Sequence, residues 1–240
     1  MNKINAELLH FTPLEVALTA IGKPYKNENP SLKLLENIVN VKKHESVIEH
    51  ISFNFNVDGF SRLCLQELVR HRIASYTAES TRYTLNKMIK DFEPFIIKYV
   101  FEEDNNTTFE INLKDKKGLF NMIDKYYVNP YCNLDKSLNG VFILENVHYC
   151  HIMNELVTLL SVKENLKGFE NLGERIEDYM KYDLTESKRT SLVLTMNLRS
   201  VRNMFKLRIS NFAHFEIRTL AKLLQNLIKE KTPYGNFVNF

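Results

Sequence analysis

The sequence predicts a single α+β domain that spans residues 1–240. One segment, residues 51–57, alternates apolar and polar residues, as a strand with one buried face does. Several longer segments instead place apolar residues at helical spacing. No internal repeat or low-complexity linker divides the chain, so one domain is the simpler organisation.

Two helices and a strand are expected at the start of the chain. Thr12 suits the N-cap and Pro13 the first helical position, so a helix is expected to begin there. A second helix is expected over residues 31–44, where apolar residues recur at helical spacing. The alternating strand follows, and we expect Asp58 and Gly59 to end it because this dipeptide favours turns.

The next segments return to a helical pattern and then become mixed. Residues 60–72 predict a helix with Arg70–Arg72 at its C-terminal end, where the helix dipole favours cations. Residues 84–115 follow neither period, and the polar segment 102–108 indicates a loop or a hairpin.

The rest of the chain is mostly helical in pattern. Residues 116–181 carry helical periodicity that is interrupted near residues 129–130 and 168. Residues 190–197 are β-branched and apolar, which fits a short buried strand and equally a helix. Residues 213–231 predict an amphipathic helix, which a proline two residues later stops.

Composition and charge exclude several classes of protein. An apolar fraction of 44% and a charged fraction of 25% are ordinary for a soluble globular protein. A formal net charge of +3 is too small for a protein that lives on nucleic acid, so no nucleic-acid partner is expected. Three scattered cysteines fit a reducing cytoplasm better than a disulfide framework. Without a long apolar run or a signal pattern, we expect a cytoplasmic protein with no membrane partner.

The stretch RHRIASYTAESTRY (Arg70–Tyr83) combines basic and hydroxyl residues, which suggests an anion. Consecutive helical residues point about 100° apart, so Arg70, His71 and Arg72 cannot all face one small ligand from a continuous helix. A solvated basic helix end is the commoner explanation of such a triplet. The hydroxyls and the arginine that follow weaken that explanation, because phosphates are bound by guanidinium groups together with hydroxyls.

A second stretch, NLRSVRNMFKLR, begins at Asn197 and carries cations beside apolar residues. The default interpretation of Arg199, Arg202 and Lys206 is an exposed helix face. That interpretation leaves Asn197 and Asn203 less well explained.

Two observations bear on metals and cofactors. The segment HESVIEH (His44–His50) lacks the i, i+4 histidine pair of a zinc helix, so we expect no metal. The chain has seven glycines and no glycine-rich phosphate loop. The phosphates of any cofactor must therefore be held by side chains and helix ends.

Together these stretches resemble one family, the flavin-dependent thymidylate synthases. The family signature is Arg-His-Arg, two residues, Ser, four residues, Ser, one residue and Arg-Tyr, and Arg70–Tyr83 carries all seven fixed positions at that spacing. The resemblance continues upstream through HESVIEH and downstream through NLRSVRNMFKLR to KEKTPYGNF near the C-terminus. Residues 86–191 show no clear resemblance.

The resemblance implies a fold and a reaction. The fold is an α+β domain with an antiparallel sheet flanked by helices. Members of the family methylate C5 of the uracil in dUMP, with methylenetetrahydrofolate as carbon donor and with FAD, reduced by NADPH, as hydride source. They are homotetramers whose active sites are shared between subunits.

By matching positions, the resemblance also implies site residues. FAD would be contacted by His44, Ser46, Glu49, Arg70, His71, Arg72, Ile73, Asn197, Arg199 and Asn203. The nucleotide would be bound by Glu67, Ser80, Thr81, Arg82 and Arg208. The residues at 80–82 would hold its phosphate, and Arg208 would be the catalytic residue that stabilises negative charge on the uracil ring.

The sequence departs from the family pattern inside the implied site. Glu67 stands where the family usually has a glutamine, Ala78 where Glu or Gln is usual, and Phe212 where a histidine is common. A family arginine upstream of Asn197 has no clear counterpart, and Lys181 and Arg175 are both candidates. These departures leave open a homologue that acts on another pyrimidine nucleotide or with reduced activity. A further alternative is a non-catalytic nucleic-acid-binding module.

Glu67 is the departure with the clearest physical consequence. An ionised carboxylate near the nucleotide phosphate repels it unless an arginine intervenes. Two outcomes are open. Glu67 pairs with Arg70 or Arg82 and is neutralised, or it recognises a donor that dUMP lacks, such as a ribose hydroxyl or a cytosine amino group.

Overall fold

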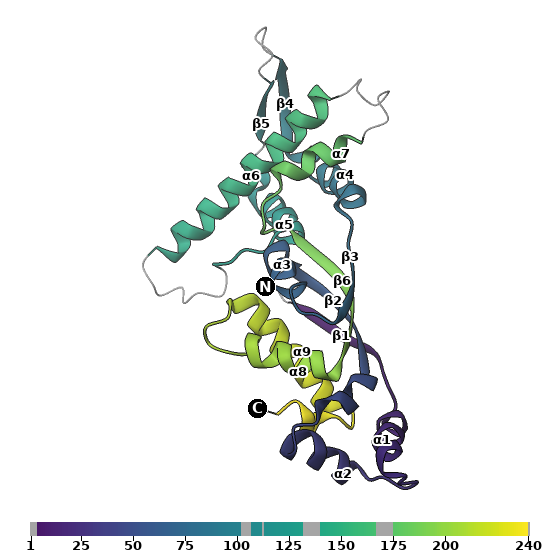
Figure 1. Ribbon diagram of the computed structural model, residues 1–240. Coiled ribbons are helices and arrows are strands. Elements are labelled where there is room, and N and C mark those ends of the chain that lie inside the picture. The colour runs from purple at the N-terminus through teal and green to yellow at the C-terminus, as the bar shows by residue number, and fades with distance from the viewer. Residues whose placement is uncertain (1–3, 102–106, 112, 132–139, 167–174, 240) are drawn as a thin grey trace. The chain divides into compact units, whose positions relative to one another are not determined.

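The computed structural model describes residues 4–101, 107–111, 113–131, 140–166 and 175–239 (Figure 1). They form two compact units. The inserted unit is Glu79–Arg189, and the sheet unit comprises residues 4–78 and 190–239. Within the described residues, the chain leaves the sheet unit once, at Glu79, and returns to it at Thr190. One domain over residues 1–240 stays a prediction.

The sheet unit contains four strands and the helices that pack on them. Its elements are β1 (Asn5–Phe11), α1 (Leu14–Gly22), α2 (Leu32–Glu36), the π-helix η2 (Asn37–Val41), the 3₁₀ helix η3 (Glu45–His50), β2 (Ser52–Ser61), α3 (Arg62–Leu68), β3 (Ala74–Ala78), β6 (Arg189–Asn197), α8 (Leu198–Arg208) and α9 (Phe215–Lys231). Short 3₁₀ turns at Lys23–Tyr25 and Gly235–Phe237 complete it.

The strands of this unit form one sheet in the order β1-β2-β6-β3. β1 pairs antiparallel with β2, and β3 pairs antiparallel with β6, where Tyr76 lies opposite Leu194. Helices α3, α8 and α9 pack around the sheet through a shared apolar core (Figure 1). The predicted α+β class, with an antiparallel sheet flanked by helices, is confirmed.

Strand β2 follows the alternation of the sequence but runs further than predicted. Phe53, Phe55 and Val57 are completely buried, as one face of a half-buried strand should be. The expectation that Asp58 and Gly59 end the strand is wrong, because β2 continues to Ser61. Gly59 has a φ of 82°, which glycine adopts at no steric cost, and the chain continues in the strand beyond it.

The first helix begins later than predicted. α1 starts at Leu14 with Pro13 as its N-cap, one position beyond the expected cap at Thr12. The Thr12 hydroxyl instead accepts the Ser52 backbone N–H at 2.9 Å, and the Thr12 backbone N–H donates to the Ser52 carbonyl. Thr12 therefore ties the end of β1 to the start of β2. The second predicted helix is present as α2 and η2, with Ser31 as its N-cap.

Residues 190–197, which the sequence left between strand and helix, are strand β6. Leu192, Leu194 and Met196 are buried at period two and belong to the core of the sheet unit. Strand β6 passes directly into α8, whose N-cap is Asn197. The long C-terminal helix α9 is present as predicted.

The inserted unit is mainly helical. Its elements are α4 (Thr81–Phe92), β4 (Ile96–Phe101), β5 (Thr107–Ile111), α5 (Lys116–Tyr126), α6 (Val141–Asn165) and α7 (Ile176–Met180), with 3₁₀ turns at Glu93–Phe95, Leu113–Asp115 and Lys181–Asp183. Strands β4 and β5 pair antiparallel, which agrees with the hairpin of the two alternatives that the sequence left open, and residues 102–106 between them lie outside the described residues. Helices α4, α5 and α6 share a second apolar core. The predicted break near residue 168 lies outside the described residues. Among the described helices, none is both long and apolar enough to cross a membrane.

Candidate functional site

A cavity of about 340 Å³ lies in the sheet unit where three segments meet. The segments are η3, the turn between α3 and β3, and the first turns of α8. The cavity is lined by Glu45, Glu49, Arg72, Ile73, Asn197, Arg199, Ser200, Asn203 and Lys206. Residues far apart in the chain therefore form one polar pocket.

Local hydrogen bonds place the start of α8 in this cavity. The Asn197 side chain accepts the Ser200 backbone N–H at 2.8 Å, which is an N-cap bond. The Ser200 hydroxyl in turn accepts the Ile73 backbone N–H at 3.1 Å. This bond attaches the turn after α3 to the first turn of α8.

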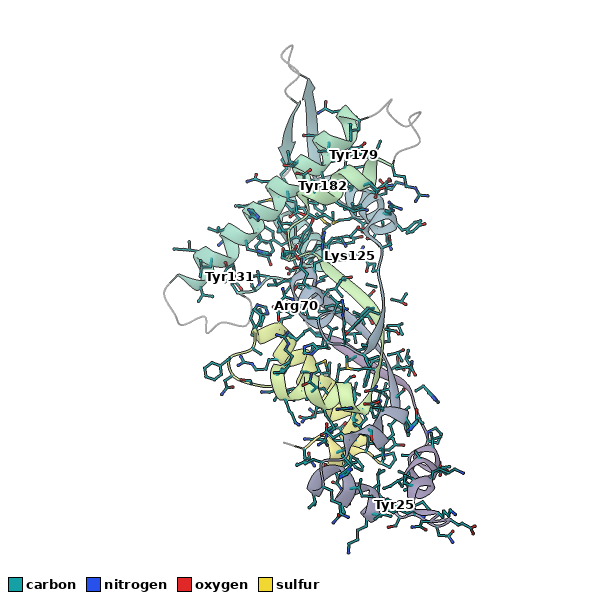
Figure 2. All side chains as sticks on the ribbon, in the orientation of Figure 1. Tyr25, Arg70, Lys125, Tyr131, Tyr179 and Tyr182 are labelled. Carbon is teal, nitrogen blue, oxygen red and sulfur yellow. The ribbon has the colours of Figure 1, made fainter. Side chains whose placement is uncertain are left out.

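The turn after α3 resolves the geometric problem of the Arg70–Arg72 triplet. α3 ends at Leu68, so the triplet does not lie on a continuous helix. Arg70 and Arg72 are exposed, whereas His71 is buried; Arg70 is labelled in Figure 2. The Tyr76 hydroxyl donates to the Leu68 carbonyl at 3.0 Å and to the His71 carbonyl at 2.7 Å. The backbone turn therefore separates two solvent-facing cations from an inward-facing imidazole.

Buried bonds hold the start of α3 as well. Ser61 is the N-cap, and its hydroxyl accepts the Cys64 backbone N–H at 3.1 Å. The buried Glu216 carboxylate of α9 accepts the Ser61 backbone N–H at 2.7 Å and the Ser61 hydroxyl. Burial, with the negative charges of Glu216 and Glu67, raises the pKa of the Cys64 thiol, so this cysteine is not a nucleophile.

The cavity carries more positive than negative charge. Its two carboxylates both approach Arg199, which donates to Glu49 and lies 3.9 Å from Glu45. Arg72, in contrast to Arg199, has no ion-pair partner among the described residues. With Lys206 also in the lining, the pocket suits an anion that offers oxygens to several donors.

Arg202 is buried, which corrects the expected exposed face of α8. Its side chain is 4% exposed, and its Nη2 lies 3.2 Å from the Glu45 carboxylate. Its Nη1 donates to the Asn40 side chain at 3.1 Å and to the Phe237 carbonyl. Arg202 therefore supports the floor of the cavity from the core side of α8.

A second polar cluster joins α8 to α3. Arg208 donates from Nη1 to the Glu67 carboxylate, from Nη2 to the Glu67 carbonyl at 3.3 Å, and from Nε to His71 Nε2 at 2.7 Å. Glu67 is thus neutralised by an arginine, but the partner is Arg208 and not one of the two that the sequence suggested. The Arg208 side chain is 19% exposed, so a ligand can still reach it.

The pKa of His71 is lowered, first by burial and second by the Arg208 charge, against an opposing effect of Glu67. The folded-state pKa therefore lies below the unfolded value of 6.5, and below pH 6.5 the unfolded chain binds more protons than the folded one. We expect the thermal stability of the protein to fall as pH falls through this window, and His71→Gln to weaken that dependence. Thermal unfolding between pH 7.5 and 5.5 measures it.

A matched control separates His71 from the other histidines. His10 is exposed on β1, so His10→Gln should keep the pH dependence of the parent protein. Gln at position 71 still offers an oxygen to Arg208 Nε, which preserves the hydrogen bond without the titration. An unchanged slope in His71→Gln contradicts the assignment.

The residues implied for the nucleotide phosphate lie in the inserted unit. Ser80 is the N-cap position of α4, and Thr81 is its first residue. The Arg82 Nε donates to the Asp178 carboxylate at 2.7 Å, and that bond is the main reason why the pKa of Asp178 is lowered to about 2. Lys181, a candidate for the missing arginine, also pairs with Asp178.

Six of the ten residues implied for the flavin line the cavity. They are Glu49, Arg72, Ile73, Asn197, Arg199 and Asn203. The other four are not in the lining: His44 and Ser46 are exposed at the start of η3, Arg70 is exposed after α3, and His71 is buried against Arg208. The roles of all ten stay predictions.

Sequence reasoning missed three lining residues, Glu45, Ser200 and Lys206. Lys206 had a usable signal, because it follows Arg199 and Asn203 at helical spacing on one face of α8. Glu45 and Ser200 had no such signal in the sequence, since their positions in the cavity depend on contacts between η3, α8 and the turn after α3.

Comparison with known proteins finds similar sequences that match nearly the whole chain. The family model described as thymidylate synthase complementing protein matches residues 8–234. A flavin-dependent thymidylate synthase of Helicobacter pylori is 32% identical over an alignment of 232 residues, and the match covers 94% of this chain and 93% of the relative. One of Wolinella succinogenes is 34% identical over 204 residues, 84% of this chain and 78% of the relative.

Solved structures agree with the sequence relatives. A crystal structure of thymidylate synthase X from Helicobacter pylori with FAD and dUMP has a TM-score of 0.70 and 26% identity, and the match covers 99% of this chain and 100% of that one. A second structure of the Helicobacter pylori enzyme, complexed with FAD and dUMP, has a TM-score of 0.65 and 28% identity over 92% of each chain.

Proposed function

Because this chain belongs to the flavin-dependent thymidylate synthase family, we propose that it catalyses the reductive methylation of dUMP to dTMP with FAD as its cofactor. The observation that carries the proposal is the cavity at the start of α8, which gathers six residues of the family's implied flavin set. The solved relatives with FAD and dUMP support the same two ligands for this chain.

The residues of the cavity fit a phosphate-bearing cofactor. Arg72, Arg199 and Lys206 supply cations, and Asn203 supplies an amide. The N-terminal end of α8, an 11-residue helix, adds backbone N–H groups and a favourable dipole. A volume of about 340 Å³ is at the small end of the range for ligand pockets, and four of the ten implied flavin residues lie outside its lining.

The remaining implied residues keep their proposed roles, apart from Glu67, whose carboxylate pairs with Arg208. When bound, FAD supplies the hydride chemistry, with NADPH as reductant and methylenetetrahydrofolate as carbon donor. His44, Ser46, Arg70 and His71 complete the proposed flavin set. Ser80, Thr81 and Arg82 hold the nucleotide phosphate, and Arg208 stabilises negative charge that develops on the uracil ring.

We also propose a homotetramer in which neighbouring subunits share the site. The spread of the implied site residues beyond the lining of this one cavity supports this assembly. A cytoplasmic location is proposed as well, and the free thiols of Cys64 and Cys150 are compatible with it.

Two measurements test the function. The purified protein should show the absorbance of bound flavin, and it should release tritium from C5-labelled dUMP when methylenetetrahydrofolate, NADPH and FAD are supplied. UMP and dCMP serve as comparison substrates because Glu67 replaces the family glutamine. A colourless protein that does not take up FAD contradicts the proposal, and tritium release from UMP or dCMP alone contradicts dUMP as the substrate.

Arg199→Ala is expected to weaken FAD binding about tenfold, because it removes a charge-assisted donor from the cavity. Fluorescence titration of the apoprotein with FAD measures the affinity. Lys222→Ala, which removes an exposed cation from α9 outside the cavity, is the control for net charge. Equal affinities for FAD in Arg199→Ala and the parent remove Arg199 from the flavin set.

A further inference from the structure

The Arg208 guanidinium is held on two sides before any ligand arrives. Glu67 takes one N–H on its carboxylate and one on its backbone carbonyl, and His71 Nε2 takes the Nε–H at 2.7 Å. Both partners come from α3 and the turn that follows it, whereas Arg208 is the last residue of α8. Three different donor nitrogens are engaged, so rotation about the long side chain is restricted.

The bonds also specify the protonation of the cluster. An imidazole nitrogen that accepts a hydrogen bond carries no proton, so His71 is neutral and has its proton on Nδ1. The groups that face His71 are Arg208 from α8 and Glu67 from α3, while Tyr76 of β3 binds its backbone carbonyl. A carboxylate, a guanidinium and a neutral imidazole together balance the charge of the cluster.

Arg208 keeps donors for a ligand. A guanidinium has five N–H groups, and three of them are used by Glu67 and His71. The two that remain belong to the terminal nitrogens, one on each. Since the side chain is 19% exposed, these two donors can meet acceptors on a planar base.

We propose that Glu67 is a positioning residue for Arg208, which presets the guanidinium for the base of the nucleotide. The inference rests on the proposed function and adds to it a role for a carboxylate at a position where the family has a glutamine. A carboxylate forms a charge-assisted bond that an amide cannot match, so it holds the guanidinium more firmly. Glu67 acts through Arg208 and does not itself contact the nucleotide.

A double-mutant cycle tests this role. In the FAD-bound enzyme, Glu67→Gln is expected to weaken dUMP binding about tenfold, because an amide oxygen holds the guanidinium less firmly than a carboxylate does. In an Arg208→Lys background the same change should alter dUMP binding by less than about twofold, since no guanidinium remains to be positioned. Calorimetry with dUMP measures all four proteins. Glu7→Gln, at an exposed position on β1, is the matched control.

Three outcomes overturn the inference. An equal loss of dUMP affinity in both backgrounds shows that Glu67 contacts the nucleotide directly. Unchanged dUMP binding in Glu67→Gln shows that Arg208 needs no positioning. Tighter dUMP binding in Glu67→Gln shows that the carboxylate repels the ligand.

Failure of the proposed function gives a different result. A parent protein that binds neither FAD nor dUMP refutes the proposed function. The coupling between Glu67 and Arg208 is then measured from the thermal unfolding of the parent, the two single variants and the double variant without ligand. Glu67→Gln and Arg208→Lys should each lower the Tm, and the double variant should lie no lower than the worse single variant. Additive losses of Tm overturn the positioning role.

Discussion

Arg208→Ala is expected to reduce turnover with dUMP by about 100-fold or more while the enzyme retains its flavin. Arg208 is the proposed donor to the uracil ring, and removal of one preorganised donor to developing negative charge has an effect of this size. Arg208 does not line the cavity that we propose for the flavin, so FAD binding should be unaffected. Tritium release from C5-labelled dUMP gives the rate, and flavin absorbance gives the occupancy.

Two further results decide what Arg208 does. Arg208→Lys keeps the positive charge but presents a point charge in place of a planar fork, so it should recover only part of the lost rate. Normal turnover in Arg208→Ala rules out the catalytic assignment. Loss of folding in both variants, detected by circular dichroism, identifies Arg208 as a structural partner of Glu67.

Arg202→Met is expected to lower the free energy of unfolding by roughly 2 kcal/mol, because it removes a buried cation from its ion pair with the partly exposed Glu45 carboxylate. Asn40 and the Phe237 carbonyl also lose their donor. Met keeps much of the side-chain volume, so the loss reports the polar contacts more than the packing. Urea denaturation measures the free energy.

The control for this substitution is Lys222→Met, which removes an exposed cation from α9. Exposed positions usually change stability by less than about 0.5 kcal/mol. If Arg202→Met is as stable as this control, Arg202 is not a structural residue of the cavity floor. A moderate loss of flavin affinity is also expected in Arg202→Met, since Glu45 lines the cavity and depends on Arg202.

Patterns within a few residues predicted two elements of the sheet unit, β2 and α9. The alternation of Phe53, Phe55 and Val57 identified β2, because side chains on a strand point to opposite faces at a period of two. Local periodicity also identified α9. It did not predict the end of β2, where Gly59 adopts a positive φ and the chain remains in the strand.

The family resemblance implied ten flavin residues, and six of them line the cavity, while their roles stay predictions. Lys206 could have been added from its helical spacing with Arg199. Helical spacing alone did not show which cation of α8 is exposed and which is buried. Arg202 and Arg199 lie on the same helix, and only packing against η3 and the C-terminal segment buries Arg202.

By itself, the sequence determined the α+β class, strand β2, helix α9 and the stretches that build the site, because these depend on residues close together in the chain. It did not predict strands β1 and β3, and it left residues 190–197 between strand and helix. Only the tertiary structure decided that Glu67 pairs with Arg208, a residue 141 positions away. That pairing requires α3 and α8 to pack around the same sheet. Hydrogen bonds form over about 3 Å, and a sequence pattern does not determine which distant side chains come that close.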